Sequence, residues 1–159
     1  MLDLAGPGVE AVPANLVLLI DSPLPLPSGG GRVINIRDLG ADPTGVRDST
    51  SAIQQALLSA AGTSAAKTGL VLVPAGAYMT TNTLLIGSNT TLFLEAGSVI
   101  RSTAGRNLLP PPSGSSCNGN LVALVSLAPG ASAVTIMGLG RLDANGFKLM
   151  SPDVSGNCR

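Results

Sequence analysis

The chain has 159 residues, of which 45% are hydrophobic, 2% aromatic and 11% charged, and its formal net charge is zero. This composition fits one domain, or a piece of one, with an aliphatic core. No basic patch interleaved with aromatic residues stands out, so we expect no nucleic-acid partner. The chain lacks histidine, the commonest general base and the usual zinc ligand, so we expect neither a metal site nor a cofactor.

Residues 1–31 are expected to form an N-terminal arm and linker. The sequence DSPLPLPSGGG at 21–31 passes from alternating prolines to a glycine run, which is typical of a linker. The longest early apolar run, 16–20, is far shorter than the roughly 20 residues of a membrane helix. No basic residue precedes this run, so no signal peptide is visible and we expect no membrane span. Either the protein stays inside the cell, or the gene begins upstream.

A strand, a turn and a helix are expected next. Residues 32–36 (RVINI) alternate as a short strand does. Residues 42–45 (DPTG) have the signature of a type I turn, with Asp42 at its first position. Ile53, Ala56, Leu57 and Ala60 then repeat with helical spacing.

The ends of this helix can also be predicted from side chains. Ser51 and Gln54 have the spacing of a capping box, and Asp48 or Ser49 could instead cap the helix one turn earlier. Gly62 is expected to end it.

Short aliphatic strands separated by frequent turns are expected after the helix. They fall in the sequences GLVLVPAG, NTLLIGSN, TTLFLEAG and SVIRS, and then in LVALVSLAPG and AVTIMGLGRLDANG. A Pro/Gly/Ser-rich loop at 107–120 separates the two groups. This loop is the best candidate for a functional excursion, although its composition fits a plain surface loop equally well.

The strands repeat, which predicts a solenoid. LVPAG at Leu72, LEAG at Leu94 and LAPG at Leu127 each close a strand with a similar corner. TLF at Thr91 recurs as TIM at Thr135, 44 residues later. If two turns lie between them, each turn has about 22 residues, which is within the range of solenoid repeats. The open last coil would leave strand edges unpaired, so we expect marginal stability and a tendency to aggregate.

An antiparallel β-sandwich is the alternative, because it also has short strands and many turns. Its hairpins favour Asn-Gly or Asp-Gly dipeptides. In this chain Asn-Gly occurs only at Asn118 and Asn145, outside any tight strand pair, so the solenoid is favoured.

Residues 33–57 (VINIRDLGADPTGVRDSTSAIQQAL) resemble the opening of the pectate lyase and polygalacturonase superfamily. Three further elements follow in the family's order: Pro-Ala-Gly-x-Tyr at 74–78, Asn-x-Thr-Leu-x-Leu-Glu-x-Gly at 89–97, and Gly-x-Gly-x-x-Asp-x-Asn-Gly at 138–146. The structural motif residues of these elements are Asp38, Gly40, Asp42, Gly45, Asp48, Gly76, Gly97, Gly140, Asp143 and Gly146.

The resemblance implies an all-β fold, an incomplete right-handed parallel β-helix with an N-terminal capping α-helix. The capped first coils would occupy residues 32–147, and 148–159 would be a truncated tail. It also implies action on a pectin-like polysaccharide and a secreted or cell-wall location.

The residues that carry out the family's chemistry are missing from this sequence. Polygalacturonases draw three catalytic aspartates from Asn-x-Asp and Asp-Asp motifs, accompanied by Gly-His-Gly and Arg-x-Lys, and none of these motifs is present. The lyase branch needs a calcium-binding carboxylate cluster, whereas the nine acidic residues here are dispersed. We therefore assign no catalytic residue, and the substrate-binding residues stay unknown.

Three interpretations of function stay open at this stage. The chain could be the N-terminal portion of a polygalacturonase-like hydrolase, which would be inactive alone. It could be a non-catalytic carbohydrate-binding or adhesin-like β-solenoid, or part of a pectate-lyase-type polysaccharide lyase.

Individual polar residues can be interpreted in two ways. Asp42 and Asp48 could be an acid/base pair, but turn and cap roles fit their positions better. Asp143 could contact substrate, yet a turn role after a strand is favoured. Arg101 and Arg106 could bind uronate carboxylates, although two exposed arginines are ordinary on a protein surface.

The remaining polar candidates are a corner glutamate and two cysteines. Glu95 is a corner residue that could form a salt bridge or face solvent. Cys117 and Cys158 could form a disulfide if the protein is exported, and are otherwise two inert thiols.

Overall fold

The structure is a computed structural model, and it describes residues 26, 31–62, 69–103 and 123–145. The proposed N-terminal arm, apart from its residues 26 and 31, lies outside these ranges, as do the 107–120 loop, both cysteines, Arg106 and the 148–159 tail. No helix among the described residues is long and apolar enough to span a bilayer.

Ten strands and two helices make up the described part of the chain. The first sheet has the order β1 (Val33–Asn35), β3 (Gly69–Val73), β6 (Thr90–Leu94), β9 (Thr135–Gly138). The second has the order β10 (Arg141–Asp143), β7 (Ser98–Ser102), β4 (Gly76–Thr80), β2 (Thr44–Asp48), and the third pairs β5 (Leu84–Ile86) with β8 (Val125–Leu127). The helices are the 3-10 helix η1 (Ile36–Leu39) and the α-helix α1 (Thr50–Ala60).

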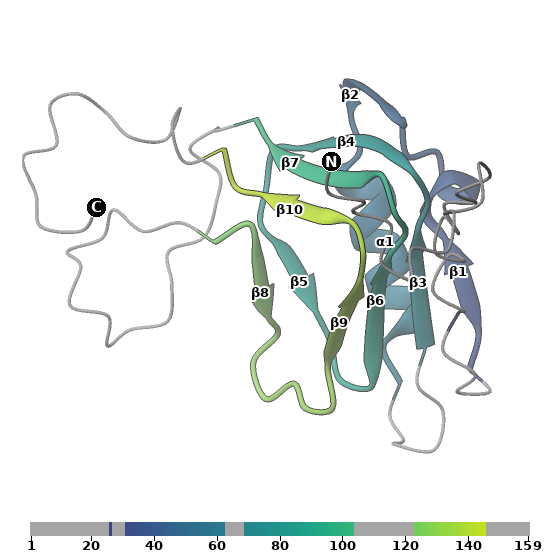
Figure 1. Cartoon of the computed structure of the whole chain (residues 1–159). Helices are drawn as coiled ribbons and strands as arrows, with labels where there is room; N and C mark the ends of the chain where they lie inside the picture. Colours follow the sequence, from purple (N-terminus) through teal and green to yellow (C-terminus); the bar gives the residue numbers. More distant parts are fainter. Residues whose placement is uncertain (1–25, 27–30, 63–68, 104–122, 146–159) are drawn as a thin grey trace, which may run out of the picture.

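Every strand pairing is parallel, and the chain visits the three sheets in turn (Figure 1). From β3 it passes to β4 in the second sheet, to β5 in the third, and back to β6 beside β3. This arrangement confirms the right-handed parallel β-helix and rules out the antiparallel sandwich. A parallel ladder cannot be closed by a tight hairpin, which fits the lack of Asn-Gly dipeptides in the described connections between strands.

The length of a coil was predicted correctly, but the number of coils was not. Gly69 pairs with Thr90 and Gly76 pairs with Ser98, so the regular coil has 21 or 22 residues. Thr91, however, pairs directly with Thr135. The 44-residue spacing is therefore a single coil enlarged between β7 and β8, and not two coils.

The three similar corners are also not equivalent. Val73 pairs with Leu94, so LVPAG and LEAG do close successive strands of the first sheet. Leu127 instead pairs with Ile86 in the third sheet. In the first sheet, the residue of the next coil that pairs with Leu94 is Gly138. The LAPG corner therefore follows a strand of the third sheet, not of the first.

The inward side chains of successive coils stack in the interior. Val71 lies beside Leu92, and Tyr78 lies beside Ile100, in the register of the ladders. All four side chains are fully buried. Small aliphatic side chains suit this narrow space, and Tyr78 is the largest fully buried residue.

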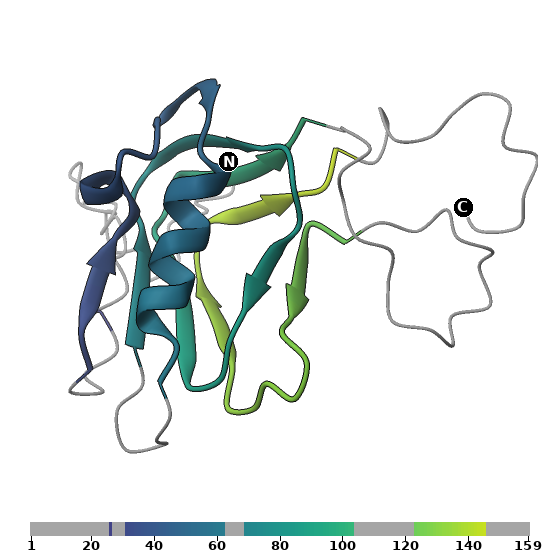
Figure 2. The ribbon, with the colours of Figure 1, turned by 180° about the vertical axis from the view of Figure 1, so that it is seen from behind.

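α1 covers the first coils on the side opposite β8, β9 and β10 (Figures 1 and 2). It contacts η1, β1, β3 and β5, and its buried face contains Ala52, Ile53, Ala56, Leu57 and Ala60. The capping helix predicted from the sequence is thus present, and it ends two residues before Gly62. Burying this apolar face holds so short a helix in place, because isolated helices of this length are marginal in water.

The predicted capping box is wrong. The N-cap residue is Ser49, whose side chain makes no capping hydrogen bond. The backbone N–H of Thr50 donates instead to Asp48 Oδ1 at 3.0 Å. Gln54 bonds instead to the backbone of Leu85.

Two strands were missed from the sequence. β2 coincides with the expected turn and cap, and its residues are mostly exposed, so it has no alternating apolar pattern. β4 begins at Gly76 and contains only small or polar residues apart from Tyr78 and Met79. Both strands form by pairing with neighbouring coils, which is a non-local interaction.

Candidate functional site

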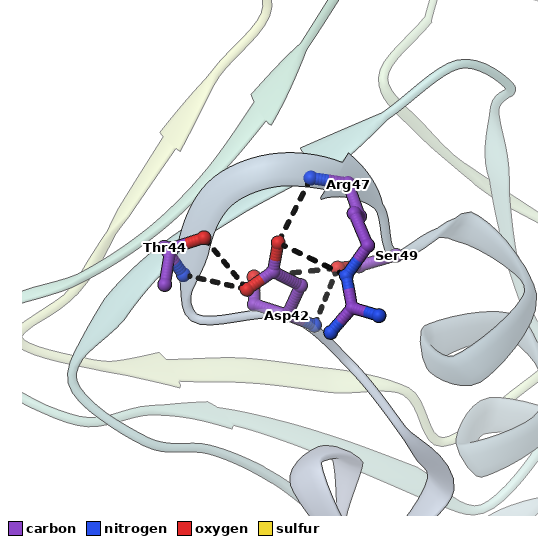
Figure 3. A network of polar contacts seen from close by, with 4 residues as sticks. All are labelled: Asp42, Thr44, Arg47 and Ser49. Atoms are coloured by element: carbon purple, nitrogen blue, oxygen red, sulfur yellow. Dashed lines mark hydrogen bonds and ion pairs between the residues drawn. The ribbon is translucent and has the colours of Figure 1, made fainter.

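The carboxylate of Asp42 lies at the centre of a polar network between η1 and β2 (Figure 3). Its Oδ1 accepts hydrogen bonds from the backbone N–H of Thr44 at 3.1 Å and from Thr44 Oγ1 at 2.7 Å. Its Oδ2 accepts one from the backbone N–H of Arg47 at 2.8 Å, and Arg47 Nε lies 3.7 Å away. The backbone N–H of Asp42 donates to Ser49 Oγ at 3.0 Å. The turn at Asp42 is therefore held by side chains: the Asp42 carboxylate binds Thr44 and Arg47, and the Ser49 hydroxyl binds the backbone of Asp42.

These contacts keep Asp42 ionised. The backbone N–H of Arg47, followed by the hydroxyl and backbone N–H of Thr44, lowers the pKa of Asp42 from 3.8 to about 2. Burial opposes the ionised form, and the Arg47 charge adds a smaller lowering. Hydrogen bonds to the charged form of an acid favour that form.

Asp48 lies at the end of β2 and joins the helix start to the second sheet. Its Oδ1 accepts hydrogen bonds from Thr50 N at 3.0 Å and Thr50 Oγ1 at 2.5 Å, and its Oδ2 accepts one from Thr81 Oγ1 at 3.0 Å. Burial disfavours its charge, but the bonds from Thr50 and Thr81 outweigh burial and lower the pKa of Asp48.

Asp42 and Asp48 are therefore poorly suited to serve as an acid/base pair. A general acid needs a raised pKa so that it carries a proton at the working pH. Both pKa values are lowered here, and each carboxylate oxygen already accepts at least one hydrogen bond from neighbouring backbone or threonine groups. The two residues organise the junction between β2 and α1.

Arg101 and Asp143 form an ion pair between neighbouring strands of the second sheet. Arg101 Nε donates to Asp143 Oδ2 at 2.8 Å, and the two residues are aligned in the β7–β10 ladder. Asp143 Oδ1 also accepts the backbone N–H of Asn145 at 2.9 Å. The Asn145 and Arg101 bonds, with Arg141 contributing less, lower the pKa of Asp143.

This alignment favours the interpretation of Arg101 as an ordinary surface residue. Its guanidinium is paired with a carboxylate of its own chain, and the pair lies on the outer face because Ile100 points inward. Asp143 closes a turn through the backbone N–H of Asn145, as the sequence pattern favours. Glu95 is also a corner residue, since its carbonyl accepts both the backbone N–H and the hydroxyl of Ser98.

A buried phenol and an exposed arginine form a further network that sequence reasoning missed. Tyr78 Oη accepts a hydrogen bond from Arg37 Nε at 3.0 Å and donates one to the Pro74 carbonyl at 3.0 Å. Arg37 also donates to the Ala75 carbonyl. Tyr78 was noted only as part of the Pro-Ala-Gly-x-Tyr element, and nothing in the sequence linked it to a residue 41 positions earlier.

The glycines of the resemblance lie at turns and strand ends. Gly40 has φ of +88° and its backbone N–H closes η1. Gly45 lies in β2, Gly76 begins β4, Gly97 lies between β6 and β7, and Gly140 precedes β10. Asp38 is an exposed residue of η1, and Gly146 lies outside the described residues.

Among the residues that the structure describes, no group of three acidic or cysteine side chains could hold a metal ion. Within the same ranges, the three aspartates with lowered pKa values are all held by hydrogen bonds to nearby groups. In the described coils these three carboxylates therefore serve as hydrogen-bond acceptors that hold turns and strand ends in place.

Comparison with known proteins shows which families and structures this β-helix resembles. Residues 33–107 match the family model described as rhamnogalacturonase A/epimerase, pectate lyase-like. The structure is similar to that of a Family 28 exopolygalacturonase from Yersinia enterocolitica, with a TM-score of 0.59 and 26% identity over 72% of this chain. The described coils belong to the pectin-lyase-like superfamily.

Two other solved structures share the fold of these pectin-lyase-like coils. One is a putative glycosyl hydrolase from Parabacteroides merdae, with a TM-score of 0.59 and 18% identity, covering 74% of this chain and 46% of the other. The second is ORF18 of Geobacillus virus E2, with a TM-score of 0.55 and 24% identity, covering 71% of this chain and 21% of the other. A comparison with curated proteins finds no match. The match to the Yersinia exopolygalacturonase covers only 21% of that protein, so this chain corresponds to about one fifth of its length.

Proposed function

We propose that this chain supplies the capped N-terminal coils of a pectin-degrading polysaccharide hydrolase, and that the catalytic aspartates are not among its residues. The observation that carries the proposal is the match to the exopolygalacturonase, which combines 26% identity with the same fold. The family model over 33–107 also describes an enzyme of pectin-type polymers. The substrate class is therefore galacturonate-containing polysaccharide.

The described carboxylates support the second half of the proposal. Inverting glycoside hydrolysis needs two carboxyl groups on opposite sides of the scissile bond, one of them with a raised pKa. Asp42, Asp48 and Asp143 have lowered pKa values. The hydrogen bonds that favour the ionised form would have to be lost before any of them could carry a proton to donate.

A polymer of galacturonate is too large to enter a cell, so its hydrolysis takes place outside. We therefore propose a secreted or cell-wall location for the complete enzyme. A disulfide between Cys117 and Cys158 would be compatible with that location.

The coding DNA beyond codon 159 tests this proposal. We expect it to encode Asn-x-Asp, Asp-Asp and Gly-His-Gly in the same frame, and we expect the longer product to release reducing ends from polygalacturonate. Release of an unsaturated sugar would identify a lyase instead. A frame without these motifs, whose product binds the polymer and leaves it intact, would favour the non-catalytic solenoid.

A further inference from the structure

Asn89 begins the sequence Asn-Thr-Thr at 89–91, which has the Asn-x-Thr form of an N-glycosylation acceptor. No other Asn-x-Ser/Thr sequence occurs in the 159 residues. Acceptors of this kind normally lie in surface loops, because the attached glycan is bulky and solvated. In this fold Asn89 lies in the turn between β5 and β6 and is only 7% exposed. The acceptor sequence therefore lies in a place where a glycan does not fit.

The side chain and the backbone of Asn89 both bind the preceding coil. Asn89 Nδ2 donates a hydrogen bond to the Gly62 carbonyl at 3.0 Å. The Asn89 carbonyl accepts one from the backbone N–H of Gly69 at 3.0 Å. The backbone of Asn89 has φ of +55°, a left-handed conformation that Asn adopts more readily than most residues. Asn89 thus bridges the end of α1 and the start of β3.

The following coil closes the other side of this turn. The backbone N–H of Asn89 donates to the Ser132 carbonyl at 2.9 Å. The backbone N–H of Ser132 in turn donates to Ser88 Oγ at 3.1 Å. Asn89 is therefore held between a neighbour from the coil before it and a neighbour from the coil after it.

The threonine of the acceptor sequence is also enclosed. Thr91 lies in β6, where it pairs with Leu70 on one side and with Thr135 on the other. Its side chain is buried, with 8% of the residue exposed. A glycosyl transferase must engage the asparagine amide and the threonine hydroxyl together, so it requires this stretch to be free of both neighbouring strands.

Glycan transfer would add a group beside Nδ2 for which the fold leaves no room. The donor is a lipid-linked oligosaccharide pyrophosphate. A bond forms between Nδ2 and the anomeric carbon, the bond from that carbon to the pyrophosphate oxygen breaks, and Nδ2 loses a proton. The first sugar ring would then be attached to the nitrogen that lies 3.0 Å from the Gly62 carbonyl. The turns of three successive coils would have to separate to admit it.

We propose that the fold and a glycan on Asn89 exclude each other. The site accepts a glycan only while the chain is unfolded, and a chain modified there cannot close its coils around the turn. This inference does not depend on the proposed function. In a secreted form made in a glycosylating compartment, the folded product carries an unmodified Asn89.

The first test is production of the chain behind a cleavable secretion signal in a eukaryotic host that glycosylates Asn-x-Ser/Thr sequences. Limited proteolysis separates folded, protease-resistant protein from unfolded, protease-sensitive protein, and mass spectrometry of the peptide that contains residue 89 detects the glycan. We expect no glycan mass on Asn89 in the protease-resistant protein. Protease-resistant protein that carries the glycan would overturn the proposal.

The second test uses a weakened fold to show that folding is what protects Asn89. A Cβ at position 138 would overlap the Leu94 carbonyl, so Gly138→Ala should increase the protease-sensitive fraction, and that fraction should carry the glycan. Adding Thr91→Val removes the acceptor sequence and should raise the protease-resistant share. Adding Thr91→Ser instead retains the acceptor sequence and is the matched control.

Two results of the second test would overturn the proposal. An unmodified Asn89 in the protease-sensitive Gly138→Ala chain would show that something other than the fold protects this residue. Equal protease-resistant shares for the Thr91→Val and Thr91→Ser combinations would show that the glycan does not obstruct folding.

Discussion

The side-chain amide of Gln54 forms two hydrogen bonds with the backbone of Leu85. Gln54 Nε2 donates to the Leu85 carbonyl at 3.0 Å, and the Leu85 backbone N–H donates to Gln54 Oε1 at 2.9 Å. Leu85 is the middle residue of β5, which pairs with β8 on its other side. The amide thus takes the place that a neighbouring strand would occupy, and it joins α1 to the third sheet.

This pairing predicts that Gln54→Met destabilises the fold. Met has a similar length but leaves the N–H and carbonyl of Leu85 without partners. We expect the free energy of unfolding to fall by about 1–3 kcal/mol, as measured by urea denaturation. Gln55→Met is the matched control, because Gln55 is exposed on the same helix, and it should change stability by less than about 0.5 kcal/mol. Equal effects at both positions would contradict this role for Gln54.

The lowered pKa of Asp42 predicts sensitivity to acid. The folded pKa is about 2, against 3.8 ordinarily, so the ionised carboxylate stabilises the native state. That contribution is complete above pH 3.8 and is lost as the pH falls toward 2. Asp48 and Asp143 act in the same direction.

Thermal unfolding between pH 5 and 2, at roughly half-unit steps, measures this dependence. Asp42→Asn should lower the melting temperature at neutral pH and flatten its decline in acid. Asp38→Asn removes the same charge from an exposed position in η1. If both variants follow the wild-type slope, the role assigned to Asp42 is wrong.

The buried hydroxyl of Tyr78 predicts a measurable coupling to Arg37. Tyr78→Phe removes the group that links Arg37 Nε to the Pro74 carbonyl, and should cost about 1–3 kcal/mol. Combining Tyr78→Phe with Arg37→Met should cost less than the sum of the two single changes, by about 0.5 kcal/mol or more. Strict additivity in this double-mutant cycle would show that the contact contributes nothing.

Gly138 pairs with Leu94 of the preceding coil, and the two backbones lie close together there. Its φ is +120°, and an added Cβ would overlap the Leu94 carbonyl, which itself accepts from the backbone of Leu139 and Gly140. Gly138→Ala should therefore cost about 3 kcal/mol or more. Gly130→Ala meets nothing within 4 Å at φ of +73°, so it carries only conformational strain of about 1–2 kcal/mol. Similar melting temperatures for the two variants would argue against close packing at Gly138.

The helix and most strands could be predicted because their signals are local. The spacing of Ile53, Ala56, Leu57 and Ala60 specifies the buried face of α1, and aliphatic runs bounded by turn residues mark β3 and β6. The number of coils could not be obtained in the same way. A spacing of 44 residues equals two regular coils, or one coil with an insertion, and only the pairing of Thr91 with Thr135 distinguishes them.

The same reasoning applies to the polar residues. Asp42 was interpreted as a turn residue because Asp-Pro-x-Gly is a local pattern. Gln54 fitted a capping box, but its partner Leu85 lies 31 positions away, and no sequence spacing indicates that contact. Side chains that pair across coils therefore had to be found from the structure.

Incubation of the 159-residue chain with polygalacturonate is the most direct test of the central claim, that these coils provide a β-helix scaffold without its chemistry. The measurement is the release of reducing ends or unsaturated sugars over time, between pH 4 and 8 at roughly unit steps, a range wide enough to include carboxylate and ordinary neutral catalysis. We predict no release above that of a buffer control. Sustained cleavage that is abolished by Asp48→Asn or Asp143→Asn, in variants that stay folded, would contradict the claim.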